Sequence, residues 1–150
     1  MKWHGGKHYL ANRIIEQFPD HHTYVEPFGG AASVLLNKEP SPVEVYCDLD
    51  ERITRLSRVL RDHGMEFQRQ LSLTPYSEVE FSRARDVSDD KIEMARRDFV
   101  TWRQSLGGRG ESFSFTLHRV RRRMADVVSG SLSAIDEQLP LIIERLRTVQ

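Results

Sequence analysis

Two adjacent glycines after a short strand-like run are the first residues here whose spacing indicates chemistry. In residues 23–38, TYVEPFGGAASVLLNK, a β-branched and aromatic run turns at Pro27, Gly29 and Gly30 and continues as an apolar run. Glycines between a strand and a helix let backbone N–H groups approach a ligand closely, and a helix N-terminus favours negative charge. The pattern therefore predicts a ligand-binding turn.

An acidic residue follows the next predicted strand at a spacing that suits a ribose. The run VEVYCDLD occupies residues 43–50, and its Asp48 lies 19 residues after Gly29. A carboxylate about 20 residues beyond such a turn accepts hydrogen bonds from ribose hydroxyls. Together the two features favour an adenosine-containing cofactor. The same glycines also suit a tight turn in which their role is only steric, and this alternative stays open.

Other common site patterns are absent from the sequence. The turn GGAAS matches neither G-x-G-x-x-G nor a phosphate-binding loop, because no G-K-[ST] follows it. The six histidines show no metal-binding spacing, and the single Cys47 excludes an internal disulfide or a cysteine-rich zinc site. No metal site is expected.

Arginine is concentrated in the middle of a chain whose formal net charge is zero. Residues 96–123 hold 8 arginines against two acidic residues, Asp98 and Glu111. Such a cluster is a candidate for contact with nucleic-acid phosphates. The residues expected to contact DNA are Arg103, Arg109, Arg119, Arg121, Arg122 and Arg123. The alternative is a solvated face of a helical region.

The elements that must position these residues fall into two parts. Residues 1–54 predict a helix over 7–17, a strand over 22–27, a helix over 31–38 and a strand over 43–50, followed by a helix that ends at Gly64. Alternation of this kind is the start of an α/β fold, a parallel sheet with helical crossovers. Residues 55–150 are mostly helical and rich in arginine.

Within the second part, local signals set the expected helix ends. The sequence SEVE at Ser77 matches a capping box, and Asp89 or Asp90 can cap the next helix. That helix is expected to bury Phe99 and Trp102. A glycine-rich loop follows, then two short helices broken at Pro140. The last residues, TVQ, could begin a third strand.

Length and composition are those of one globular domain. The chain has 150 residues, 39% of them hydrophobic and 29% charged. The N-terminus lacks the apolar segment of a signal peptide, and no run reaches the roughly 18 apolar residues of a membrane span. We therefore expect a cytoplasmic protein without a membrane partner.

Three motifs in order carry a family resemblance. They are KWHGGK at residues 2–7, YVEPFGGAASVLLNK at 24–38 and VYCDLD at 45–50. They resemble the D12 class, Dam-like DNA adenine-N6 methyltransferases, especially the phage and prophage forms. The stretches TPYSEVEFSRA, RQSLGGR and AIDEQLPLIIERLR also resemble those phage proteins, so the resemblance covers essentially the whole chain.

This resemblance implies a fold and a set of site residues. The fold is an incomplete Rossmann-like methyltransferase fold with a mostly helical DNA-recognition insertion. Residues 1–54 would begin the S-adenosyl-L-methionine-binding domain, 55–147 would form the target-recognition region, and 148–150 would start a truncated strand. The cofactor-binding residues implied are Trp3, Gly5, Gly6, Lys7, Glu26, Pro27, Phe28, Gly29, Gly30 and Asp48.

Two departures from the family pattern concern activity. Ala32 stands where the motif often has another glycine. More importantly, the methyl-transfer motif [DN]-P-P-[YF], which holds the target adenine in the family, does not occur, and no two of the 6 prolines are adjacent. We therefore expect the N-terminal portion of a site-specific methyltransferase that acts on double-stranded DNA, with no catalytic residue of its own and no activity alone.

Three alternatives remain. The chain could be a non-catalytic DNA-binding module or prophage remnant, or one half of a split enzyme whose second chain carries the missing C-terminal half. It could also be a nucleotide-dependent enzyme of another class, such as a dehydrogenase. The absence of G-x-G-x-x-G and the presence of K-W-x-G-G-K argue against the last.

Overall fold

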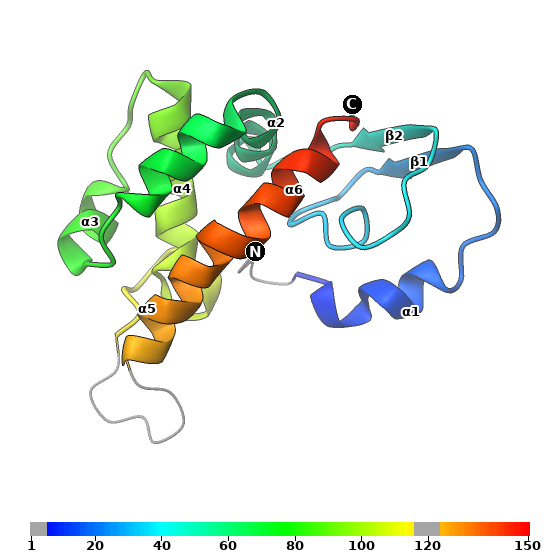
Figure 1. The fold of residues 1–150 in the computed structure, drawn as a ribbon. Coiled ribbons are helices and arrows are strands. Elements are labelled where there is room, and N and C mark those ends of the chain that lie inside the picture. The colour runs from blue at the N-terminus through cyan, green and yellow to red at the C-terminus, as the bar shows by residue number, and fades with distance from the viewer. Residues whose placement is uncertain (1–5, 116–123) are drawn as a thin grey trace.

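A small parallel sheet lies beside a larger group of helices (Figure 1). The computed structural model describes residues 6–115 and 124–150. Strands β1 (Thr23–Glu26) and β2 (Val43–Tyr46) pair in parallel, with Thr23 opposite Val43 and Glu26 opposite Tyr46. Both predicted strands and their parallel pairing are confirmed.

In the described part of the chain, the helices are more numerous than the strands and occupy just over half of the residues. Before the sheet lie the short 3-10 helix η1 (His8–Leu10) and α1 (Ala11–Ile15). After it come α2 (Glu51–Ser72), α3 (Glu78–Arg83), α4 (Lys91–Arg103), the 3-10 helix η2 (Leu106–Gly108), α5 (Met124–Ser133), the π-helical segment η3 (Ala134–Gln138) and α6 (Leu139–Leu146). No helix in the described part of the chain is both long and apolar enough to cross a membrane.

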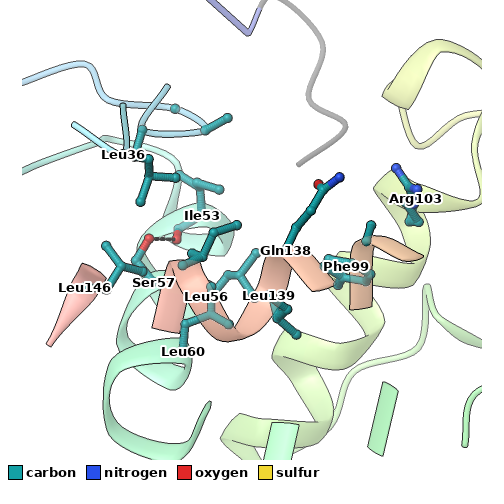
Figure 2. A pocket seen from close by; sticks show the side chains of 15 residues that line it. Leu36, Ile53, Leu56, Ser57, Leu60, Phe99, Arg103, Gln138, Leu139 and Leu146 are labelled. Atoms are coloured by element: carbon teal, nitrogen blue, oxygen red, sulfur yellow. Dashed lines mark hydrogen bonds between the residues drawn. The ribbon is translucent and has the colours of Figure 1, made fainter. Parts of the chain in front are cut away.

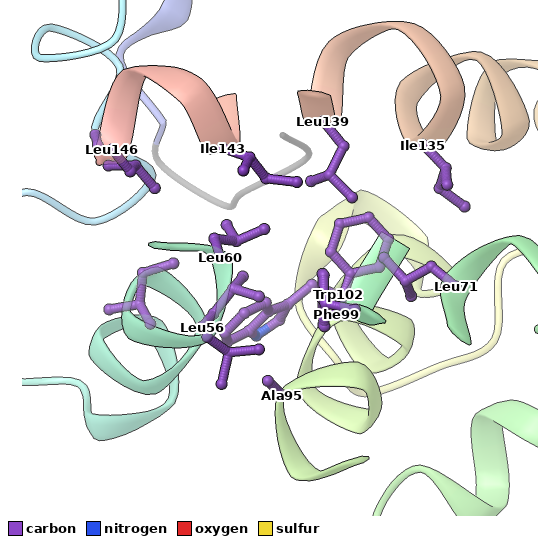
Figure 3. Close-up of a cluster of buried hydrophobic side chains, with 14 of the residues drawn as sticks. Leu56, Leu60, Leu71, Ala95, Phe99, Trp102, Ile135, Leu139, Ile143 and Leu146 are labelled. Carbon is purple, nitrogen blue, oxygen red and sulfur yellow. The ribbon is translucent and has the colours of Figure 1, made fainter. Parts of the chain in front are cut away.

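The hydrophobic core forms where α2 meets α4 and the run from η3 to α6 (Figure 3). Helix α2 contributes Leu56, Leu60, Phe67 and Leu71; α4 contributes Ala95, Phe99 and Trp102; η3 and α6 contribute Ile135, Leu139, Ile143 and Leu146. The rings of Phe67 and Phe99 meet edge to face with centroids 6.0 Å apart. Phe99 and Trp102 are therefore core residues, as expected from the sequence.

The predicted helix starts are confirmed by their capping bonds. The Ser77 side chain accepts a hydrogen bond from the Glu80 N–H at 3.1 Å and opens α3. At α4, the carboxylate of Asp90 accepts from the N–H groups of Ile92 at 2.8 Å and Glu93 at 3.2 Å. Of the two aspartates proposed as caps, Asp90 is thus the N-cap of α4.

The helix predicted over residues 31–38 is wrong. The segment forms successive turns, with Ala32 at a φ of +53°, in the left-handed region. The Leu35 N–H donates to Oε2 of Glu26 at 3.0 Å instead of to a carbonyl of its own turn. A tertiary bond therefore replaces the helical one, and no helix N-terminus follows the glycines. We call residues 31–38 the turn segment.

Neither predicted helix break is a loop. Helix α2 kinks at His63, whose φ of −134° and ψ of 24° are not helical, so the break expected at Gly64 is a kink and not an end. The helix continues beyond it, and an added Cβ at Gly64 would lie 2.6 Å from Ile143 of α6. This glycine therefore permits close helix packing. Pro140 lies in the first turn of α6, as expected, but α5, η3 and α6 run on as one rod with no loop between them (Figure 1). The Leu139 N–H bonds the Ala134 carbonyl, so the helix passes into α6 through a π-helical turn.

The end of the chain lies against the free edge of β2. The Gln150 N–H donates to the Glu44 carbonyl at 3.0 Å, and the Tyr46 N–H donates to the Gln150 carbonyl at 2.9 Å. This alternation is the bonding pattern of a parallel strand. Residues 148–150 are thus placed where a third strand would begin.

The Asp90 cap provides a test of the helix start. Replacing Asp90 with alanine leaves two N–H groups of α4 without their acceptor and should lower the free energy of unfolding by about 1 kcal/mol. Urea denaturation of the D90A and D89A variants checks this, because Asp89 is the matched neighbour for which no capping bond is observed. Equal destabilisation by both changes would contradict the assignment.

Candidate functional site

The carboxyl ends of the two strands open at the same edge of the sheet. Beyond the strands, the Cys47 N–H donates to the Glu26 carbonyl and the Gly29 N–H donates to the Cys47 carbonyl, both at 3.0 Å. These bonds carry the parallel ladder into the turn. The residues that follow β1 therefore lie beside those that follow β2, as the sequence predicts for Gly30 and Asp48.

Both glycines of the turn have a structural reason to be glycine. A Cβ at Gly29 would lie 2.2 Å from the ring of Tyr46. The hydroxyl of Tyr46 donates to the Gly30 carbonyl at 2.6 Å, and Gly30 has a φ of +49°. Steric and backbone constraints thus explain why both positions are glycine. The glycines alone therefore do not indicate a ligand, and other groups must supply that evidence.

Asp48 is held in one orientation by the backbone. Its Oδ2 accepts from the Gly30 N–H at 2.7 Å, and its Oδ1 accepts from the Asp50 N–H at 2.9 Å. Each carboxylate oxygen can accept a further bond. The side chain is half-buried and can still receive two hydroxyl donors from a ligand.

A cleft of about 320 Å³ lies over this edge. Seven of the ten predicted cofactor residues line it: Gly6, Lys7, Glu26, Phe28, Gly29, Gly30 and Asp48. Ala31 and Ser33 complete the lining, whereas Pro27 is not part of it. Trp3 and Gly5 lie outside the described residues. The Phe28 side chain is 82% exposed and leaves an aromatic face free for a ligand.

Glu26 forms a second acidic wall of the cleft. Burial raises the pKa of its carboxyl, while hydrogen bonds from the Leu35 N–H at 3.0 Å and the Tyr24 hydroxyl at 3.2 Å act in the opposite direction. The cleft therefore carries two carboxyl groups, Glu26 and Asp48, against the one cation Lys7 among its lining residues. Such a site favours a positively charged or hydroxyl-rich ligand over an anionic phosphate.

Sequence reasoning did not identify Tyr46 as part of the site. Its ring fills the space beside Gly29, and its hydroxyl fixes Gly30. Tyr46 and Asp48 are two residues apart on one strand and its extension, and side chains at this spacing share a face. The alternation of side chains along the strand was the sequence signal that could have placed Tyr46 beside Asp48.

A second cavity lies behind the cleft, between the turn segment, α2 and the run from η3 to α6 (Figure 2). It shares Gly30 and Ala31 with the cleft but measures only about 30 Å³, and its walls are mostly apolar. Figure 2 shows Gln138 and Arg103 on one side of it. A space of this size holds one or two water molecules, so it is too small for a nucleoside.

The predicted DNA-contacting arginines differ in their surroundings. Arg103 donates from Nε to the Ser131 hydroxyl at 3.3 Å and from Nη2 to the Gly130 carbonyl, and burial lowers its pKa. Arg109 is exposed, in a loop where Gly107, Gly108 and Gly110 have positive φ. Arg119, Arg121, Arg122 and Arg123 lie outside the described residues.

Two other arginines of the basic stretch are neutralised locally. Arg96 pairs with Glu80 and Glu93, and Arg97 pairs with Glu93. They therefore contribute little to a phosphate-binding surface. Across residues 6–115 and 124–150, no group of three or more His, Cys, Asp or Glu side chains is placed to hold a metal ion.

Comparison with known families identifies one match. The family model of the D12 class N6 adenine-specific DNA methyltransferase matches residues 3–108, more than half of the 150-residue chain. The matched range includes the whole cleft and Arg103 but ends before Arg109. No curated protein matches the chain.

The contact between Gly29 and Tyr46 can be tested by adding one methyl group. The G29A variant must displace the Tyr46 ring and should lose about 1–3 kcal/mol of unfolding free energy through overpacking. Gly130 on α5 is the matched control, because an added Cβ there meets nothing within 4 Å. Thermal unfolding should show G130A at or above the wild-type stability. Equal stability of the two variants would rule out the close approach.

Proposed function

The chain belongs to the D12 class N6 adenine-specific DNA methyltransferases, and from that premise we propose that its cleft binds S-adenosyl-L-methionine and that its arginine-rich part contacts double-stranded DNA. The observation that carries the proposal is the pair of oriented carboxyl groups, Glu26 and Asp48, in one cleft. Adenine-N6 transfer is the chemistry of the family.

Asp48 is proposed to hold the ribose of the cofactor. Because Gly30 and Asp50 fix both of its oxygens, the carboxylate needs little reorganisation to accept two hydroxyl protons. The rest of the cofactor is assigned by the family motifs to Trp3, Gly5, Gly6 and Lys7 on one side and to the turn at Glu26, Pro27, Phe28, Gly29 and Gly30 on the other. An exposed ring such as that of Phe28 can pack against the adenosyl group.

The charge of the cleft favours this cofactor over a dinucleotide. S-adenosyl-L-methionine carries positive charge on its sulfonium and amino groups, which suits Glu26 and Asp48. A pyrophosphate would lie between two carboxyl groups and would lack the helix N-terminus that such sites use, because the turn segment is not helical. The dehydrogenase alternative is therefore disfavoured.

The methyl-transfer step is proposed to need residues that this sequence does not contain. The two parallel strands, with Gln150 paired to β2, suit the beginning of a Rossmann-like sheet. A strand with [DN]-P-P-[YF] must still supply the groups that hold the target adenine. Our proposal is a protein of phage type that binds cofactor and DNA but transfers no methyl group alone. A non-catalytic DNA-binding module or prophage remnant is the second candidate, favoured by the absence of that motif.

Cofactor choice is tested by calorimetric titration with S-adenosylhomocysteine and with NAD. We expect binding of the first and none of the second. The D48N change should weaken the binding at least tenfold, because an amide must turn an NH₂ group toward one of the two backbone donors. The D62N variant, changed at a surface aspartate of α2, should bind as the wild type does. Preference for NAD, or equal affinity of D48N and wild type, would contradict the proposal.

DNA contact is tested through salt dependence. The arginines proposed for this contact are Arg103, Arg109, Arg119, Arg121, Arg122 and Arg123. Replacing Arg121, Arg122 and Arg123 with alanine should weaken binding and reduce the slope of log K against log salt by about one for each lost phosphate contact. The control is R69A, at an exposed arginine of α2 paired with Glu66. An unchanged slope in the triple variant would count against DNA contact there.

The proposal that methyl transfer needs a strand with [DN]-P-P-[YF] is tested by an activity assay and by the gene sequence. A tritium-transfer assay with the 150-residue chain should show no methylation of DNA. Sequencing beyond codon 150, and in adjacent frames, should reveal [DN]-P-P-[YF] if the chain is the front of a working enzyme. Methyl transfer by the chain alone would overturn the proposed dependence on that motif.

A further inference from the structure

A buried ion cluster joins three parts of the chain that are distant in sequence. Glu44 of β2 is 3% exposed, and Lys38 of the turn segment is 6% exposed. Oε1 of Glu44 lies 2.7 Å from Nζ of Lys38 and 2.7 Å from Nη2 of Arg145 on α6, whose Nη1 contacts Oε2 at 2.5 Å. Burial would raise the pKa of Glu44, but hydrogen bonds from Arg145, Lys38 and the Ser41 N–H lower it to about 2.

Arg145 also reaches beyond this cluster to the turn segment. Its Nη2 donates to the Leu35 carbonyl at 3.0 Å, while the Leu35 N–H donates to Oε2 of Glu26 at 3.0 Å. Leu35 is fully buried. Arg145 of α6 thus holds the carbonyl of Leu35. The N–H of the same residue holds the carboxyl group of Glu26, which lines the cleft.

The turn segment needs such external support because it is not a helix. The Leu35 N–H is used by a side chain, and Ala32 interrupts the helical backbone at a φ of +53°. Backbone bonds such as those from the Leu36 N–H to the Ala32 carbonyl at 2.9 Å and from the Lys38 N–H to the Val34 carbonyl at 3.0 Å close its turns. At Leu35, side chains from β1 and α6 take the place of such local bonds.

We infer that Arg145 is a positioning residue for the cofactor cleft: by holding Leu35, it fixes the side chain of Glu26 at the cleft wall. This inference deepens the proposed function and rests on it for the identity of the ligand. It does not require Arg145 to touch the cofactor.

A link between the helical region and the cleft follows. Helix α6 continues from η3 and α5, and Arg103 joins α5 to the end of α4, beside the loop that carries Arg109. The hydrogen bond from Arg145 to Leu35 is thus a point where the region proposed to meet DNA is joined to the wall of the cleft. An ordinary stabilising ion pair would instead affect folding without a selective effect on the cleft.

The R145K variant distinguishes a positioning role of Arg145 at the cleft from the role of an ordinary stabilising ion pair. R145K keeps a charge for Glu44 but loses the planar fork that bonds Glu44 and the Leu35 carbonyl together. The matched control is R147K, because Arg147 lies two residues further on and pairs at the surface with Glu144. R145Q removes the charge as well and gives the stronger variant of the same test.

The primary measurement is amide hydrogen exchange by NMR. In R145K the Leu35 amide should exchange at least tenfold faster than in R147K, while the amide of Phe99 in α4 keeps its wild-type rate. If R145Q folds, its Leu35 amide should exchange faster still, again with no change at Phe99. If R145Q does not fold, the comparison of R145K with R147K is the test. Equal exchange at Leu35 in R145K and R147K would overturn the inference.

Titration with S-adenosylhomocysteine supplies the second readout. We expect about tenfold weaker binding by R145K and wild-type binding by R147K. Unchanged affinity of R145K would overturn the cofactor role of Arg145. If the wild-type chain binds no S-adenosylhomocysteine, the proposed function fails, and the exchange rate of Leu35 still decides whether Arg145 positions the cleft wall.

Discussion

The buried carboxylate of Glu44 is the constraint on which the assembly of strand, turn segment and C-terminal helix depends. A charge this well removed from water is tolerated only with good partners, and the loss of one partner from such a pair is strongly destabilising. Lys38 and Arg145 supply those partners from the turn segment and α6. One carboxylate therefore fixes the position of three segments that local sequence signals do not connect.

The groups that face the cleft are oriented before any ligand arrives. Asp48 is bonded to two backbone N–H groups, and Glu26 is bonded to the N–H of Leu35. Preorganisation of this kind reduces the cost of ordering a site on binding. Together with the acidic character of the cleft, it supports the proposed sulfonium cofactor over a pyrophosphate ligand.

Local patterns in the sequence were sufficient for the strands, their parallel pairing and the caps at Ser77 and Asp90. The strands and the caps depend on side chains only a few residues apart, and the parallel pairing was predicted from the alternation of helices and strands along the chain. The turn segment could not be predicted in this way, because Glu26 takes the N–H of Leu35 across nine residues. Local patterns also could not predict the close packing of Gly64 against Ile143 of α6. Nor could they predict the ion pair of Glu44, because its partner Arg145 is 101 residues away. Motif spacing located the cleft residues, but the reason for Gly29 lies in the ring of Tyr46.

A crystal structure of the chain with S-adenosylhomocysteine is the most direct test that this cleft is a cofactor site. The ribose hydroxyls should donate to Asp48 while Gly30 and Asp50 keep their bonds to the same carboxylate. The amino acid portion of the ligand should lie near Glu26. A ligand bound away from Asp48, or an empty cleft at saturating ligand, would contradict the assignment.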